Sequence, residues 1–253
     1  MSTDLSGHRF VLATDLDGTF LGGSKADRAQ LYNWIEENRT TVGLIFVSGR
    51  DPDFIHELCG SGVPWPDYVI GDVGTTIARV TPGREIAPIE ELEEDIAARW
   101  KDSGNMVRET LDGHPGLEVQ TTGFRYRVSY DYDPERFDPS ATDKIEALGL
   151  DVLISDNRFF DVLPGGVSKG PSLLRLLSHL DIATGDVLAA GDTLNDLSML
   201  VAGTPAVAVG GSEKPLLDAL PEADRIFRAG DIGAAGILEA VRYFNLHAAP
   251  EKV

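Results

Sequence analysis

The stretch "FVLATDLDGT", residues 10–19, joins a continuous apolar run to two aspartates and a glycine. An apolar run without polar alternation is typical of a parallel strand that is covered on both faces. Asp15 and Asp17 follow the run, and from there both carboxylates can reach a cleft beyond the carboxyl end of the strand. Gly18 allows the chain to turn sharply at this point. The stretch therefore predicts a buried strand with an acidic site at its end.

The same kind of apolar run recurs along the chain and alternates with helical patterns. Further runs lie at residues 42–47, 68–71, 186–190 and 205–209, and helical patterns at 24–38, 51–60, 169–180 and 194–203. Strands that alternate with helices favour an open, parallel α/β sheet of the Rossmann-like kind. In such a sheet, ligands bind beyond the carboxyl ends of the strands.

The middle of the chain breaks this rhythm. An acidic helical segment at 89–104 is followed by alternating segments at 117–120 and 124–133, a helical segment at 141–149, and a strand pair at 151–155 and 158–164. Alternation predicts antiparallel strands with one open face. Pro and Gly punctuate the chain near 81–83 and 163–166. We therefore expect an inserted α+β domain at residues 80–164, within a core formed by residues 1–79 and 165–253.

Composition restricts the classes of partner. The 253 residues are 42% apolar and carry 22 basic and 41 acidic side chains, a formal charge of −19. Such a charge disfavours nucleic acid and anionic membranes as partners, and it fits either a solvated surface or adaptation to salt. Cys59 is the only cysteine, so an intramolecular disulfide is excluded. With no signal-peptide pattern and no apolar run of about 18 residues, we expect a soluble, cytoplasmic protein.

Polar groups also follow the other apolar runs. Ser48-Gly49-Arg50 ends the second run and offers a hydroxyl and a guanidinium suited to phosphate oxygens. The fourth run ends in "GDTLND", residues 191–196, and Lys169 stands at a helix start, where an anion can bind. Taken singly, each group has an ordinary explanation: turn residues, a helix cap by Asp192 or Thr193, or a solvated lysine. An EF-hand starting at Asp15 is excluded because its twelfth position is Ala26.

As a set, these groups resemble the four motifs of the haloacid dehalogenase (HAD) superfamily, in its phosphatase branch. The matching residues are Asp15-x-Asp17-Gly18-Thr19, Ser48, Lys169 and Gly191-Asp192-x-x-Asn195-Asp196. The insertion resembles the large α/β cap of Cof-like sugar phosphatases, sucrose-phosphate phosphatases and phosphomannomutases. Residues 66–77 are similar to the segment that leads into this cap in sucrose-phosphatase-like members. The resemblance implies a HAD core with an inserted cap domain that selects the substrate.

The resemblance also implies a role for each motif residue. Asp15 is the expected nucleophile, which forms an aspartyl phosphate, and Asp17 is the expected general acid and then base. Lys169 is expected to offset the negative charge shared by Asp15 and the phosphoryl group. The expected substrate-binding residues are Thr19, Ser48, Gly49, Arg50 and Asn195.

Magnesium is the cofactor that the resemblance implies. Its expected ligands are the Asp15 carboxylate, the Asp17 carbonyl and Asp192. Asp196 and Asn195 are expected to orient Lys169 or the metal-bound waters, with Asp196 as a further candidate ligand. An acid at position 17 favours phosphoryl transfer over dehalogenation, because the dehalogenase branch lacks an acid there.

These expectations favour a Mg²⁺-dependent phosphatase for a sugar phosphate, with a disaccharide or glycosyl-polyol phosphate such as sucrose phosphate as a candidate. A sugar phosphomutase of the phosphomannomutase kind is the alternative, and a catalytically silent binding protein is a third hypothesis. We expect a monomer or a homodimer, with hinges near residues 81–83 and 164–166. Candidate sugar contacts in the insertion are Arg125, Tyr126, Arg127, Asn157 and Arg158, although charged residues on an alternating strand are more often solvated.

Overall fold

The computed structural model describes residues 5, 8–155 and 157–250. The chain divides into two compact units, one made of Met1–Ile89 with Lys169–Val253 and the other of Glu90–Ser168. The inserted unit thus begins and ends later than the expected boundaries at 80 and 164. The later beginning arises because the chain adds a further strand, Ile86–Pro88, to the main sheet before it leaves the first unit.

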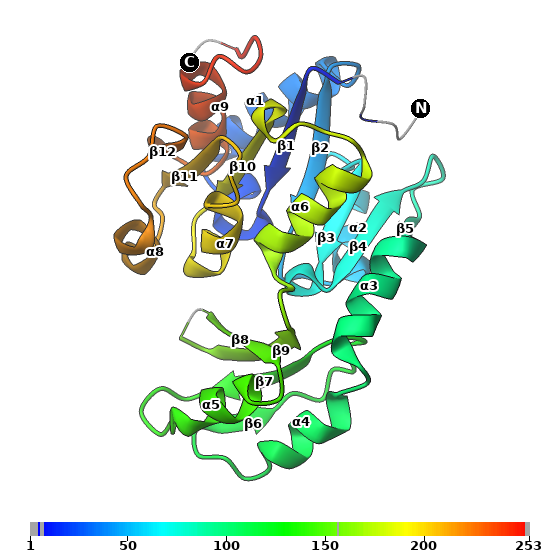
Figure 1. Ribbon diagram of the computed structural model, residues 1–253. Helices are drawn as coiled ribbons and strands as arrows, with labels where there is room; N and C mark the ends of the chain where they lie inside the picture. The colour runs from blue at the N-terminus through cyan, green and yellow to red at the C-terminus, as the bar shows by residue number, and fades with distance from the viewer. Residues whose placement is uncertain (1–4, 6–7, 156, 251–253) are drawn as a thin grey trace. The chain divides into compact units, whose positions relative to one another are not determined.

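The first unit is built on a mixed sheet (Figure 1). Among the described residues, its strand order is β12-β11-β10-β1-β2-β3-β4-β5, with parallel pairing from β12 to β3 and antiparallel pairing of β4 and β5. Its strands are β1 (Phe10–Thr14), β2 (Val42–Val47), β3 (Tyr68–Gly71), β4 (Thr76–Val80), β5 (Ile86–Pro88), β10 (Val187–Gly191), β11 (Ala206–Gly210) and β12 (Ile226–Ile232). The predicted Rossmann-like sheet is confirmed, whereas β4, β5 and β12 were not predicted from the sequence.

Helices cover both faces of the parallel part of this sheet. Side chains from α1 and α9 join alternate strand residues such as Phe10 and Leu12 in one apolar core. Helices α6 and α7 lie on the other side, against β3, β10 and β11 (Figure 1). This double cover explains why β1, β2 and β10 are buried along their whole length. The helices are α1 (Lys25–Glu37), α2 (Pro52–Gly60), α6 (Lys169–His179), α7 (Leu197–Leu200), α8 (Lys214–Ala219) and α9 (Ala234–Tyr243).

The register of the central strands brings the motif segments together. Thr14, the last residue of β1, pairs with Phe46 of β2 on one side and with Ala190 of β10 on the other. The residues that follow these three strands therefore leave the sheet at the same edge. Among the described residues, no helix is long and apolar enough to cross a membrane.

The second unit has the antiparallel sheet that the alternating segments predicted. Its strand order is β6-β7-β9-β8, and its helices pack on a core that includes Trp100, Tyr130 and Phe160. Helix α4 was not predicted, and residue 156, in the predicted β8–β9 turn, lies outside the described residues. The elements are α3 (Glu90–Trp100), α4 (Gly104–Thr110), β6 (Leu117–Val119), β7 (Val128–Tyr132), α5 (Ser140–Glu146), β8 (Leu150–Ser155) and β9 (Phe159–Pro164).

Candidate active site

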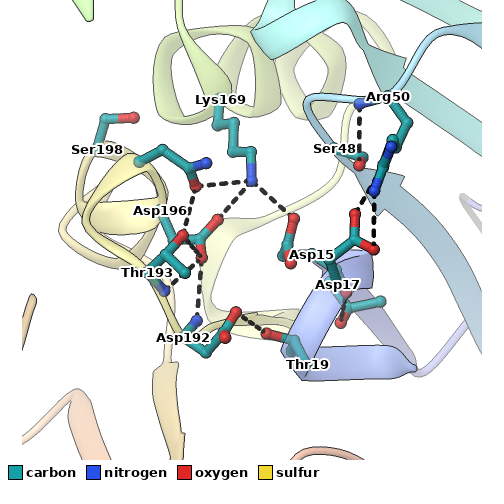
Figure 2. A network of polar contacts seen from close by, with 12 residues as sticks. Asp15, Asp17, Thr19, Ser48, Arg50, Lys169, Asp192, Thr193, Asp196 and Ser198 are labelled. Atoms are coloured by element: carbon teal, nitrogen blue, oxygen red, sulfur yellow. Dashed lines mark hydrogen bonds and ion pairs between the residues drawn. The ribbon is translucent and has the colours of Figure 1, made fainter. Parts of the chain in front are cut away.

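Asp15 lies at the centre of a polar network beyond the end of β1 (Figure 2). Its backbone N–H continues the sheet by donating to the Ala190 carbonyl at 2.9 Å. Its side chain is almost fully buried, and one carboxylate oxygen accepts a hydrogen bond from Lys169 Nζ at 2.7 Å. The local fold thus fixes both the backbone and the carboxylate of this residue.

Lys169 is the first residue of α6 and is 1% exposed. Besides Asp15, its Nζ donates to Asp196 Oδ1 at 2.6 Å and to Asn195 Oδ1 at 3.0 Å, so three acceptors match its three N–H groups. Gly170 permits this placement, because a Cβ there would lie 2.0 Å from the Ser198 carbonyl oxygen. The helix start predicted at Lys169 is present. The close approach of Gly170 to Ser198 packs α6 tightly on α7.

The charges of this network are strongly coupled. Burial raises the pKa of Asp15 well above its usual value, and the Lys169 ammonium only partly opposes this, while Asp196 and Asp192 add to it. Burial alone would lower the pKa of Lys169, but the charges of Asp15 and Asp196 outweigh it and raise that pKa. The cluster holds more negative charge than one lysine balances. A further cation would relieve this excess.

Asp196 holds the 191–196 loop together. Its Oδ2 accepts from the backbone N–H groups of Asp192 at 3.0 Å and Thr193 at 3.1 Å, while its Oδ1 accepts from Lys169. Thr193 occupies the N-cap position of the short turn Leu194–Asp196, one of the two caps predicted. With both oxygens engaged, Asp196 fits an orienting role better than that of a metal ligand.

Asp192 adds a third carboxylate to the cluster of Asp15 and Asp196. Its Oδ1 accepts a hydrogen bond from Thr19 Oγ1 at 2.8 Å. Burial, followed by the charge of Asp196, raises the pKa of Asp192 to about 6. Carboxylate oxygens of Asp15, Asp192 and Asp196 all lie within 4.8 Å of one another. The carboxylates of Asp15 and Asp192 are hard oxygen donors of the kind that fits Mg²⁺. Thr19, which was expected to contact substrate, donates its hydroxyl to the Asp192 carboxylate.

Gly18 is the residue that lets the first motif approach Asp192. Its φ of +82° lies in the left-handed region, and a Cβ there would lie 2.1 Å from Asp192 Oδ2. A side chain at position 18 must therefore displace the carboxylate. The predicted sharp turn at this glycine is confirmed.

We expect Gly18→Ala to lower the free energy of unfolding and to weaken binding of divalent metal. Gly149→Ala is the matched control, because Gly149 has a φ of +75° but a Cβ there would have no atom within 4 Å. The control bears only the backbone cost of about 1 kcal/mol, and Gly18→Ala should lose at least about 1 kcal/mol more through the steric clash. Urea unfolding measures the difference. Equal losses in the two variants would contradict the assigned contact.

Asp17 points away from the Lys169 network and toward Arg50 (Figure 2). Arg50 Nε donates to Asp17 Oδ2 at 2.9 Å and Nη2 donates to Oδ1 at 3.3 Å. This hydrogen bond is the main reason that the pKa of the Arg50 guanidinium is raised. The guanidinium also lies over the Phe54 ring, 4.5 Å from its centroid. Arg50 was expected to contact substrate, and the structure places it on the predicted general acid.

Ser48 and Gly49 follow β2, as predicted. Ser48 is buried, and its Oγ accepts from the Arg50 backbone N–H at 3.2 Å. Its carbonyl accepts from the N–H of Val73, a buried residue with a φ of +62°. A β-branched residue in the left-handed region is unusual and strained. Sequence reasoning missed Val73, because nothing in the pattern signals this conformation.

Three candidate sugar-contact residues of the second unit interact with other side chains of that unit. Arg125 forms an ion pair with Glu93, and Arg158 lies over the Phe159 ring. Arg127 is 7% exposed, forms an ion pair with Asp161 at 3.3 Å and lies 3.5 Å from the centroid of the Phe124 ring. The expectation that charged residues of this segment are solvated is therefore wrong for Arg127. Its side chain is buried, and Asp161 on β9 neutralises its charge.

Comparison with known proteins decides the family. The family model described as sucrose-6F-phosphate phosphohydrolase matches residues 8–245. The chain belongs to this family. The family consists of HAD-superfamily phosphatases, which are phosphoric monoester hydrolases, so the predicted resemblance is confirmed. The sucrose-phosphatase of Synechocystis sp. PCC6803, solved with sucrose and phosphate, has a TM-score of 0.84 and 24% identity over 94% of this chain and 98% of that chain. This likeness supports the fold.

Three curated relatives are similar to this chain over most of its length. A glucosylglycerol-phosphate synthase of Pseudomonas anguilliseptica is 39% identical over 93% of this chain, which spans only 31% of that protein. A mannosylfructose-phosphate phosphatase of Agrobacterium fabrum is 29% identical over 94% of this chain and 97% of its own length. Sucrose-phosphatase 1 of Nicotiana tabacum is 28% identical over 95% of this chain and 60% of its own.

Proposed function

We propose that the protein is a Mg²⁺-dependent phosphatase that hydrolyses a phosphorylated glycoside through a phosphoryl group carried on Asp15. The observation that supports this most strongly is the buried Asp15 carboxylate, held by Lys169 at 2.7 Å and grouped with the carboxylates of Asp192 and Asp196. A nucleophilic carboxylate that must approach an anionic phosphoryl group needs nearby positive charge, and this site supplies a lysine and oxygen ligands for a cation.

The proposed first step is attack by an Asp15 oxygen on phosphorus. The P–O bond to the sugar breaks, and Asp17 gives its proton to the departing oxygen. In the second step Asp17 takes a proton from water, which attacks the phosphorylated Asp15 and releases phosphate. Lys169 remains bonded to Asp15 through both steps and offsets the added charge. The Ser48 hydroxyl, which accepts from the Arg50 N–H, can still donate its own proton to a phosphoryl oxygen.

We infer that Asp15, Asp192 and the Asp17 carbonyl hold Mg²⁺. Asp196 is then a positioning residue, since Lys169 and two backbone N–H groups occupy its oxygens. When bound, the cation supplies charge that stabilises the phosphoryl group during transfer. Thr19 orients Asp192 through its hydrogen bond at 2.8 Å, so its proposed part in substrate binding is indirect.

We propose that the unit Met1–Ile89 with Lys169–Val253 carries the chemistry, and that the unit Glu90–Ser168 is the cap that selects the sugar. The division rests on the network around Asp15, whose residues all belong to the first unit. The insertion into the first unit supports the second half of the proposal, because selection by an inserted domain is what the resemblance implies.

The names of the relatives narrow the substrate class. The family name and the two relatives named for glucosylglycerol phosphate and mannosylfructose phosphate all refer to a glycoside that carries a phosphate. We therefore infer a phosphorylated disaccharide or glycosyl-polyol as the substrate. The match to a phosphohydrolase family favours hydrolysis over the mutase reaction.

A phosphate-release screen tests this function. The panel contains sucrose 6F-phosphate, mannosylfructose phosphate, glucosylglycerol phosphate, glucose 6-phosphate and glycerol phosphate, each with Mg²⁺. We expect at least one phosphorylated glycoside to be hydrolysed with kcat/KM at least about tenfold above the two simple phosphates, because sugar contacts contribute to the transition state. Isomer exchange without phosphate release would support the mutase instead, and binding without release would support a silent protein.

A further inference from the structure

We propose that Arg50 is a positioning residue that acts on the reaction through Asp17. This inference rests on the proposed phosphatase function, in which Asp17 moves the proton. It gives Arg50 a task other than the substrate contact that its sequence position suggests.

Arg50 and Asp17 form a bidentate ion pair, which we call the Arg50–Asp17 fork. Arg50 Nε and Nη2 each donate to a different oxygen of the Asp17 carboxylate, at 2.9 and 3.3 Å. Two parallel hydrogen bonds from a planar guanidinium fix both the position and the plane of a carboxylate. In Figure 2, Arg50 lies on the side of Asp17 that faces away from Lys169. Lys169 therefore binds Asp15, whereas Arg50 binds Asp17, the other carboxylate of the first motif.

Arg50 is itself held in place before any substrate arrives. Its backbone N–H donates to Ser48 Oγ, and its carbonyl accepts from the N–H of Asp72 at 3.0 Å. Its guanidinium rests over the ring of Phe54, which α2 presents. The start of α2 is fixed by Asp51, whose Oδ1 accepts from the Phe54 N–H at 2.8 Å. Two backbone hydrogen bonds and the Phe54 ring therefore hold Arg50 beside Asp17.

Asp17 needs such support. Its side chain is 55% exposed, and among the described residues its carboxylate accepts hydrogen bonds from Arg50 alone. It also precedes Gly18, where the backbone takes a left-handed turn. An exposed carboxylate without a partner samples several rotamers, and acid–base catalysis requires it within hydrogen-bond reach of one oxygen atom. A half-exposed ion pair adds little to folding stability, so its presence at this site favours a role in orientation.

Two aryl phosphates of similar shape test the proposal. Nitrophenolate leaves phosphorus without a proton, whereas phenolate depends more on a general acid. We expect Arg50→Gln to lower kcat/KM about tenfold or more for phenyl phosphate and clearly less for 4-nitrophenyl phosphate, since a positioned acid contributes on the order of 10²-fold or more. Asp17→Asn should show the same order of losses, and Arg50→Lys should recover part of the loss. Arg228→Gln, which breaks an exposed ion pair with Glu222 elsewhere in the unit, is the control and should keep full activity.

A double-mutant cycle decides whether Arg50 acts through Asp17. If it does, Arg50→Gln causes little further loss of phenyl phosphatase activity in the Asp17→Asn background, although it causes a large loss in the wild-type background. An equal loss in both backgrounds, an equal loss on both esters, or a change in KM alone would overturn the proposal and assign Arg50 to substrate binding. The outcome is separable from that of the proposed function: if the wild-type protein with Mg²⁺ hydrolyses no phosphate ester, the function itself fails.

Discussion

Asp15→Asn is expected to lower kcat for phosphate release by at least about 10³-fold, equivalent to about 4 kcal/mol of transition-state stabilisation. The amide keeps the volume of the carboxylate but does not attack phosphorus. The fold should persist, because Lys169 retains Asp196 at 2.6 Å as its charge partner and Asn195 as a further acceptor. Phosphate release under saturating substrate measures the first effect, and circular dichroism with thermal unfolding measures the second.

Asp53→Asn is the control for this substitution. Asp53 lies in the first turn of α2 and is exposed, so its loss should leave kcat unchanged. Activity of Asp15→Asn near the wild-type level would assign the nucleophile to another residue. Unfolding of that variant at room temperature would show instead that the buried ion pair with Lys169 is required for stability.

Removal of divalent metal with EDTA is expected to reduce activity at least about 100-fold, with full recovery on addition of Mg²⁺. The same cation should stabilise the fold, by about 2.7 kcal/mol at a concentration 100 times its Kd. Without metal, the carboxylates grouped around Asp15 repel one another, and binding relieves this repulsion. The shift in Tm on addition of Mg²⁺ measures the effect independently of activity.

The Mg²⁺-dependent shift in Tm should grow between about pH 5 and pH 7. The pKa of Asp192 is about 6 in the folded, metal-free protein against an ordinary value of 3.8, so the folded state binds more protons over this interval. The free energy of unfolding of the metal-free protein therefore falls as pH rises through this window. A proton on Asp192 also competes with the cation below about pH 6. Asp192→Asn should remove most of the shift, and a shift that is unchanged from pH 5 to pH 7 would contradict Asp192 as a ligand.

The strands and motifs of the candidate active site could be predicted because they depend on short stretches of sequence. A continuous apolar run indicates a doubly covered strand, and parallel strands end at one edge of a sheet. The segments after β1, β2 and β10 meet there for this reason. Asp15, Lys169 and Asp192 accordingly lie in one network, as the motifs indicated.

The partners of individual side chains could not be predicted in the same way. The Arg50–Asp17 fork depends on the rotamers of two half-exposed residues 33 positions apart, which no periodicity encodes. The left-handed conformation of Val73 is imposed by tertiary packing against the intrinsic preference of valine. Burial of Arg127 likewise depends on a strand partner, Asp161, that lies far along the chain.

The domain boundary was misplaced for a related reason. Thr81 to Gly83 carry the punctuation expected at the exit from a domain, yet they form a turn between β4 and β5 within one sheet. Whether a strand after such a turn stays in the sheet depends on pairing with a distant neighbour. Local composition does not contain that information.

The most direct test of the account is to look for the phosphoryl group on the protein during turnover. The enzyme is mixed with a hydrolysed substrate and Mg²⁺, quenched in acid within the first turnovers, cleaved with pepsin and examined by mass spectrometry. The account predicts a peptide containing Asp15 that carries one additional phosphoryl group, and its absence in Asp15→Asn. A phosphoryl group on any other residue, or turnover with no phosphorylated peptide at any quench time, would contradict it.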